Sequence, residues 1–219
     1  MPAPTLAPAI DVLLARIYRH YPKGVESDDS RHRSSEESRR LACVQEAAAR
    51  SCEWRFYAIP EDERVAIDPD VQDVVHALRA WRSFAARWGE ESPDSILWDE
   101  SNPWHDASYR YSALRPGYEH SSEEWRDPVV CAVSVLAPVY AIYTYVPVPG
   151  SRMEICYASF PDQYHDRIAR LDALATEMFG FARLDEDVLL HPVSDVVPLA
   201  SNLLVGEARL RDCLFSTCP

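Results

Sequence analysis

Two histidines in this sequence are each followed directly by an aspartate and could support acid–base chemistry or metal binding. His105 precedes Asp106, and His165 precedes Asp166. An imidazole beside a carboxylate can transfer protons near neutral pH or ligate zinc. Zinc sites usually place their ligands at a short fixed spacing, as in HExxH, and the sequence contains no such pattern. We therefore expect neither a metal nor a cofactor. An enzyme that uses His105, His120 or His165 with nearby carboxylates stays an alternative.

The distribution of glycine excludes several nucleotide-dependent and hydrolytic enzymes. The chain has 6 glycines, and no two of them are closer than 26 residues. A phosphate-binding loop needs clustered glycines, because backbone N–H groups must approach the anion closely. The GxGxxG, Walker A and GxSxG patterns are therefore absent.

The 6 cysteines indicate reduced thiols and give no sign of a catalytic or metal-binding set. They include no CxxC pair, and Cys131 and Cys156 lie in apolar runs where a free cysteine is usually buried. Cys213 lies late in a predicted helix, away from the helix N-terminus that would favour a thiolate. With no disulfide framework and no signal peptide, a cytoplasmic location is expected.

The charge balance favours a cationic partner. Thirty-five acidic residues oppose 22 basic ones, which gives a net charge of −13. Such a field repels phosphate backbones and anionic membrane surfaces, so binding to nucleic acid or to a membrane is not expected. Nearly all basic residues are arginines, which suggests GC-rich codon usage and a bacterial source.

The acids are interleaved with aromatic residues between positions 90 and 127. Pairs such as Asp99-Glu100 could perform acid–base work, although adjacent acids in polar sequence are usually solvated. Aromatic side chains can anchor a partner while surrounding carboxylates steer it. The alternative is that the aromatic rings pack over a sheet and the acids face water. The predicted partner-binding residues are Glu90, Glu91, Asp94, Trp98, Asp99, Glu100, Trp104, Asp106, Tyr109 and Tyr111.

Helical periodicity and capping signals predict four helices. The first covers about residues 8–22, and the second begins at a capping box formed by Ser34 and Glu37. The third begins at Pro69 and ends near Gly89, and the fourth covers residues 161–179 with Gly180 as its stop. Residues 54–59 fit either a helical extension or a short strand.

Strands are predicted mainly in the second half of the chain. Residues 129–149 carry no charge and are long enough to span a membrane, but Pro138 interrupts them and their β-branched, alternating character favours strands. We predict strands at residues 129–136, 139–146 and 152–158, with antiparallel neighbours because the connections are short. Residues 188–190 and 203–205 are further short candidates, and residues 208–215 a short closing helix.

These elements predict an α+β fold with N-terminal helices, a small and mostly antiparallel sheet, and a C-terminal helix. The expected organisation is a single domain, 1–219. Its parts are a helical part at about 8–89, an irregular acidic and aromatic stretch at 90–127, and a sheet-plus-helix part at 128–219.

The order of elements in the last third of the chain resembles bacterial polymorphic-toxin immunity proteins. The likeness lies in the helix at 161–180, the segment 184–198 and the segment from Gly206 to Phe215. It implies a small acidic cytosolic α+β protein that neutralises a co-encoded toxin by occlusion, and it assigns no site residues. We therefore predict a protein-binding inhibitor of a basic partner. A structural subunit of a larger assembly is a further alternative.

Overall fold

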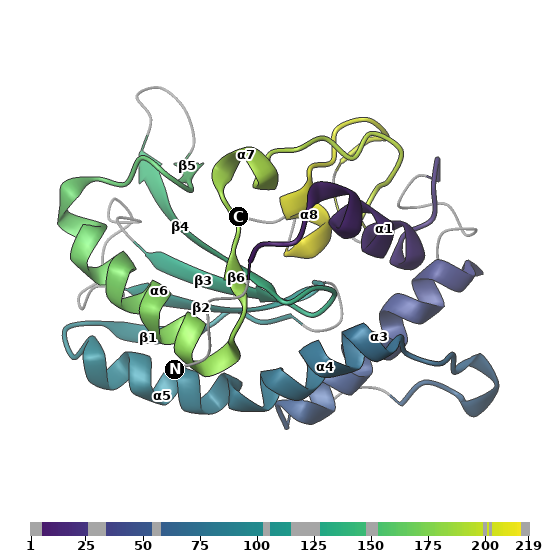
Figure 1. Ribbon diagram of the computed structural model, residues 1–219, viewed down its shortest axis with the longest axis horizontal. Helices are drawn as coiled ribbons and strands as arrows, with labels where there is room; N and C mark the ends of the chain where they lie inside the picture. The colour runs from purple at the N-terminus through teal and green to yellow at the C-terminus, as the bar shows by residue number, and fades with distance from the viewer. Residues whose placement is uncertain are drawn as a thin grey trace.

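The computed structural model describes most of the chain, and its elements are drawn in Figure 1. The described residues are 6–25, 34–53, 58–102, 106–114, 128–147, 153–198, 201 and 203–215. The helices are α1 (Ile10–His20), α3 (Glu36–Ser51), α4 (Pro69–Ala77), α5 (Trp81–Glu91), α6 (His165–Phe179), α7 (Glu186–Leu189) and α8 (Leu210–Leu214). Short 3-10 turns are η1 (Glu61–Glu63), η2 (Leu78–Ala80) and η4 (Asp162–Tyr164).

The strands form one mostly antiparallel sheet, which confirms the predicted α+β class. They are β1 (Ile96–Asp99), β2 (Ser108–Leu114), β3 (Val129–Ser134), β4 (Val139–Pro147), β5 (Met153–Cys156) and β6 (Ala182–Arg183). The order is β1-β2-β3-β4-β5 with antiparallel neighbours throughout, and β6 pairs with β4 in parallel. The apolar segment 129–147 is therefore a strand pair. No helix among the described residues has the length and apolar character that a membrane crossing needs.

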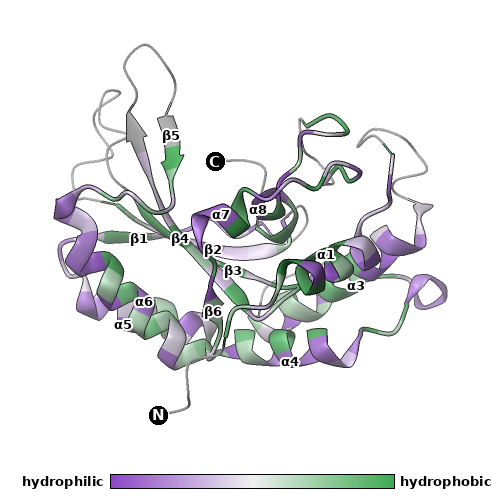
Figure 2. Cartoon of the chain, turned by 45° about the horizontal axis from the view of Figure 1, so that its top comes forward, coloured by the Kyte–Doolittle hydropathy of each residue, from purple (hydrophilic) through white to green (hydrophobic). Residues whose placement is uncertain are grey.

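Helices pack against the sheet in two groups (Figure 1). Helices α5 and α6 lie side by side and contact each other, and α6 crosses β4 and β6. Helices α1, α3 and α8 gather at the other end of the molecule, where α1 contacts both α3 and α8. Figure 2 shows that hydrophobic and hydrophilic residues alternate around the helices, as expected for elements with one buried face.

The buried residues of both groups and of the sheet belong to one hydrophobic cluster. Trp81 is fully buried at the start of α5 and stacks on Tyr111 of β2, with 4.8 Å between ring centroids. Phe84 and Phe179 also contact the Trp81 ring, with centroid distances of 5.6 Å and 6.1 Å. The helical and sheet segments that the sequence distinguished therefore share a core.

Local sequence signals account for some helix ends and not for others. The cap of α3 is Ser35, whose hydroxyl accepts a hydrogen bond from the Ser38 N–H at 3.1 Å, so the predicted Ser34–Glu37 box is wrong by one residue. Gly180 ends α6 in a left-handed conformation with φ of 68°, as predicted. Gly89 does not end the third helix, because α5 continues to Glu91.

Two strand predictions and one loop prediction are wrong. Residues 188–190 overlap α7, which begins after Asp185 with acidic residues in its first turn, a favourable position for negative charge. Residues 203–205 form no strand, because Leu204 and Glu207 close a turn through a 3.1 Å backbone bond. The stretch 90–127, predicted to be irregular, contains β1 and β2. Residues 54–57 lie outside the described part, so the choice between helix and strand there stays open, whereas Ala58 and Ile59 belong to neither.

The contrast in burial between Trp81 and Trp98 gives a stability prediction. We expect Trp81→Ala to lower the free energy of unfolding by about 3–5 kcal/mol, because it removes a fully buried ring from a packed cluster. Trp98→Ala should change it by less than about 1 kcal/mol, since the Trp98 side chain is 60% exposed. Urea denaturation of both variants measures the difference, and equal losses would contradict this account of the core.

Candidate functional site

Strand β1 lies at the edge of the sheet and carries the exposed aromatic residue of the predicted contact stretch. Among the described residues β1 pairs only with β2, in the register Ile96 with Leu114 and Trp98 with Ser112. Side chains alternate between the two faces of a strand. Leu97 therefore faces the helices and packs against the core, while Ile96 and Trp98 face the other side.

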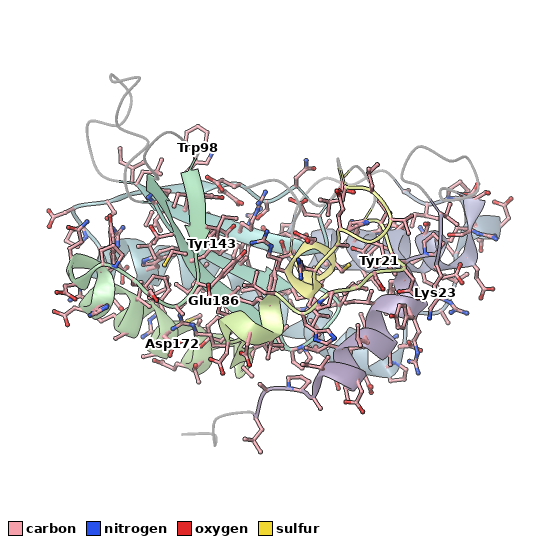
Figure 3. All side chains as sticks on the ribbon, turned by 90° about the horizontal axis from the view of Figure 1, so that it is seen from above. Tyr21, Lys23, Trp98, Tyr143, Asp172 and Glu186 are labelled. Carbon is pink, nitrogen blue, oxygen red and sulfur yellow. The ribbon has the colours of Figure 1, made fainter. Side chains whose placement is uncertain are left out.

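Trp98 is the main apolar feature of this edge. Its side chain is 60% exposed, whereas Trp81 and Trp88 are at most 2% exposed. Figure 3 shows Trp98 at the rim of the molecule, away from Tyr143 over the sheet. Ile96, two residues earlier on the same face, is 39% exposed. An exposed tryptophan with an exposed neighbour is unusual for a residue type that is mostly buried, and it is typical of contact surfaces.

The carboxylates at the end of α5, in the following turn and on β1 differ in exposure. Glu90 and Asp94 are exposed at the end of α5 and in the turn that leads into β1. Glu91 lies 3.8 Å from Arg87, an exposed pair worth little energy. Asp99 and Glu100 are half-buried, and Asp99 Oδ1 accepts a hydrogen bond from the Ser101 N–H at 3.0 Å. We refer to Glu90, Glu91, Asp94, Ile96, Trp98, Asp99 and Glu100 as the β1 surface.

Asp106 is mostly buried and does not belong to the β1 surface. Its carboxylate forms an ion pair with Arg110 at 3.1 Å, and the two side chains are 11% and 9% exposed. The Arg110 backbone N–H donates to Ser101 Oγ at 2.9 Å, which ties β2 to the segment after β1. The ion pair is therefore internal to the start of β2, and the Asp106 carboxylate has little surface to offer a partner.

Tyr109 and Tyr111 are also core residues. Tyr109 is 1% exposed and lies 5.8 Å from Trp81 in an edge arrangement, while Tyr111 stacks on the same indole. Burial raises the pKa of both phenols, and Asp99 raises them further. The expectation that these rings anchor a partner does not fit their placement. They support the other interpretation, in which aromatic rings of this stretch pack against the sheet and helices.

Two further residues complete the comparison with the predicted set. Trp104 lies outside the described residues. Ile96 was not predicted, although it opens an apolar run, Ile96 to Trp98, whose β-branched and aromatic residues favour a short strand and could have identified it.

The described histidines and cysteines do not form a site of the predicted acid–base or nucleophilic kind. His165 is exposed in the first turn of α6, where one ring nitrogen contacts the Phe160 carbonyl at 2.9 Å and the other lies 3.8 Å from Asp162. His105 and His120 lie outside the described residues. Burial raises the pKa of the Cys52 thiol to about 12 and also raises that of Cys213, so neither is a ready thiolate. Within the described part of the chain, no group of three or more His, Cys, Asp or Glu residues could hold a metal ion.

Comparison with known proteins identifies no relative: no family model, no curated protein and no solved structure matches this chain. The geometry of the chain itself is therefore the basis for a functional proposal.

The different roles of Asp106 and Asp94 can be separated by substitution. Asp106→Ala should lower the free energy of unfolding by about 3 kcal/mol or more, because it leaves the Arg110 charge buried without its carboxylate. Asp94→Ala, the matched control, should change it by less than about 0.5 kcal/mol because Asp94 is exposed. Chemical denaturation measures both free energies of unfolding. A small loss of stability for Asp106→Ala would contradict the structural role of this carboxylate and would support its place on the contact surface.

Proposed function

We propose that this chain is a protein-binding module that captures a basic protein partner through the β1 surface. The observation that carries the proposal is the exposure of Trp98 on an edge strand, beside the exposed Ile96. A tryptophan desolvated by a partner contributes a large share of the binding free energy at many interfaces. A folded chain that keeps such a ring in water has a contact surface available at that position.

The acidic charge of the chain and of the β1 surface selects the class of partner. Glu90 and Asp94 are exposed at the end of α5 and in the turn that leads into β1, and the whole chain has a net charge of −13. Negative potential of this kind accelerates the approach of a cationic protein and opposes the approach of an anionic one. A basic protein is therefore the partner that this surface fits.

The proposed mechanism is occlusion. The carboxylates would orient the incoming partner, and burial of Trp98 and Ile96 would slow its release. In the immunity-like form of this proposal the partner is a co-encoded bacterial toxin, whose working surface the chain covers inside the cytoplasm. The support is the combination of an acidic surface, an exposed anchor and an α+β scaffold.

The decisive experiment places a photo-reactive amino acid at position 98 and identifies the cross-linked protein in the source cell. We expect one basic protein, whose affinity for the chain falls by a factor of about 30 or more in Trp98→Ala, as for a central interface residue. Leu204→Ala is the matched control because Leu204 is 61% exposed on the segment before α8. Equal binding by both variants, or an acidic partner, would reject the proposal.

The electrostatic part has its own test. The double variant Glu90→Gln/Asp94→Asn should lower the association rate and its dependence on salt, and it should leave the dissociation rate nearly unchanged. The control Glu61→Gln/Asp62→Asn removes the same two charges from the exposed η1 turn. If both doubles slow association equally, the net charge of the chain and not the β1 surface is responsible.

A further inference from the structure

A polar pocket between α1, α3 and the segment before α4 lies apart from the β1 surface. Its volume is about 290 Å³. Figure 1 shows α1 and α3 at the end of the molecule away from β1. The side chains that line the pocket come from all three elements: Arg19, His20, Arg40, Val44, Ala66, Ile67 and Asp68.

His20 is the unusual member of this lining. It is 3% exposed, and its Nδ1 lies 2.7 Å from the carbonyl oxygen of Arg16, one turn earlier in α1. A carbonyl oxygen only accepts hydrogen bonds, so Nδ1 carries the proton and Nε2 of the neutral ring is an acceptor. Among the described residues Nε2 has no hydrogen-bond partner. Because His20 lines the pocket, this nitrogen is open to a hydrogen-bond donor that enters it.

The charged groups of the pocket favour an anion. Arg19 and Arg40 both line it, and the one carboxylate in the lining, Asp68, pairs with Arg19 at 2.8 Å. Arg40 also pairs with Glu36, which is exposed at the start of α3 and does not line the pocket. The lining itself therefore carries two positive charges against one negative charge, in a protein whose net charge is −13.

We propose that this pocket binds inorganic phosphate, with Arg40 and Arg19 donating to its oxygens and Nε2 of His20 accepting the hydrogen bond of its P–OH group. Arginine guanidinium groups match the geometry of phosphate oxygens. The acceptor nitrogen adds a requirement for a ligand that is both an anion and a hydrogen-bond donor. Phosphate meets this requirement at neutral pH, whereas sulfate is of similar shape and has no hydrogen to donate.

The protonation state of His20 decides this selectivity. Burial lowers the pKa of His20, and Arg40 and Arg19 lower it further, while the Arg16 carbonyl and Asp68 act in the opposite direction. His20 is therefore neutral at pH 8 and accepts from phosphate. When the pH falls below its pKa the ring gains a second N–H, and Nε2 can then donate to sulfate.

Calorimetric titration of the whole chain at pH 8 and constant ionic strength tests the site with inorganic phosphate and with sulfate. We expect phosphate to bind at least about tenfold more tightly than sulfate, and Arg40→Gln to weaken phosphate binding about tenfold, the usual effect of losing one charge-assisted hydrogen bond. Arg39→Gln is the matched control, because Arg39 is exposed on the same helix and does not line the pocket. Equal affinities for the two anions, or equal effects of the two variants, would overturn the proposal.

Imidazole nitrogen spectra of the unmodified protein give a second measurement that does not depend on how a variant folds. Phosphate should shift the Nε2 resonance of His20 and leave the exposed His76 and His165 unchanged, and sulfate should do so only at acidic pH. Binding of sulfate should accordingly weaken as the pH rises through the pKa of His20. A His20 resonance that ignores phosphate would refute the site even if an anion binds elsewhere.

Discussion

The packing of Trp81 between the helices and the sheet is the interaction on which the rest of this structure depends. The indole contacts two tyrosines of β2, the following turn of α5 and the end of α6, with centroid distances of 4.8 to 6.1 Å. Its N–H is buried without a hydrogen-bond partner among the described residues, which costs about 1–3 kcal/mol. Four aromatic contacts at about 0.5–1.5 kcal/mol each, in addition to the buried area, outweigh that cost. The ring also fixes the direction of α5 after the η2 turn, so that Gly89 lies beside Leu97 and β1 is held at the edge of the sheet.

The sequence predicted the elements whose signals are local. The strand pair β3 and β4 and the helix α6 follow from β-branched alternation, a break at Pro138 and the left-handed stop at Gly180. It did not predict β2, because this strand is buried along nearly its whole length and includes Arg110 in its interior. Such a strand lacks the alternation of a half-exposed one, and a charged residue at its centre argues against burial unless its partner Asp106 is known. The sequence shows that aromatic rings and acids share one stretch. It does not show which rings are buried, because the contact of Tyr109 and Tyr111 with Trp81 and the exposure of Trp98 depend on tertiary packing.

The distribution of ion pairs explains why the excess of negative charge remains on the surface. Among the residues that the structure describes, ten arginines lie within 4.0 Å of a carboxylate. The most buried of these carboxylates, Glu46, binds Arg50 and Arg64 and accepts from the Ile59 N–H, which fastens the segment before α4 to α3. Among the described residues, Arg87 pairs with Glu91, and none of the other arginines in these ion pairs has an acid of the β1 surface as its partner. A chain with 35 acidic and 22 basic residues therefore keeps exposed carboxylates such as Glu90 and Asp94.

The β1 surface and the His20 pocket differ in the physical basis of the recognition proposed for each. At β1 the ligand is selected by sign of charge and apolar area, which tolerates many basic partners and gains specificity from shape. At His20 two guanidinium groups bind the anion, and the acceptor nitrogen favours an anion that carries a hydrogen to donate. This combination discriminates between anions of equal size. The two regions are connected through α4, η2 and α5, the continuous helical path that the Trp81 cluster holds against the sheet. A ligand at His20 would therefore influence β1 only by moving the segment before α4 relative to Trp81, and a rigid aromatic core opposes that movement.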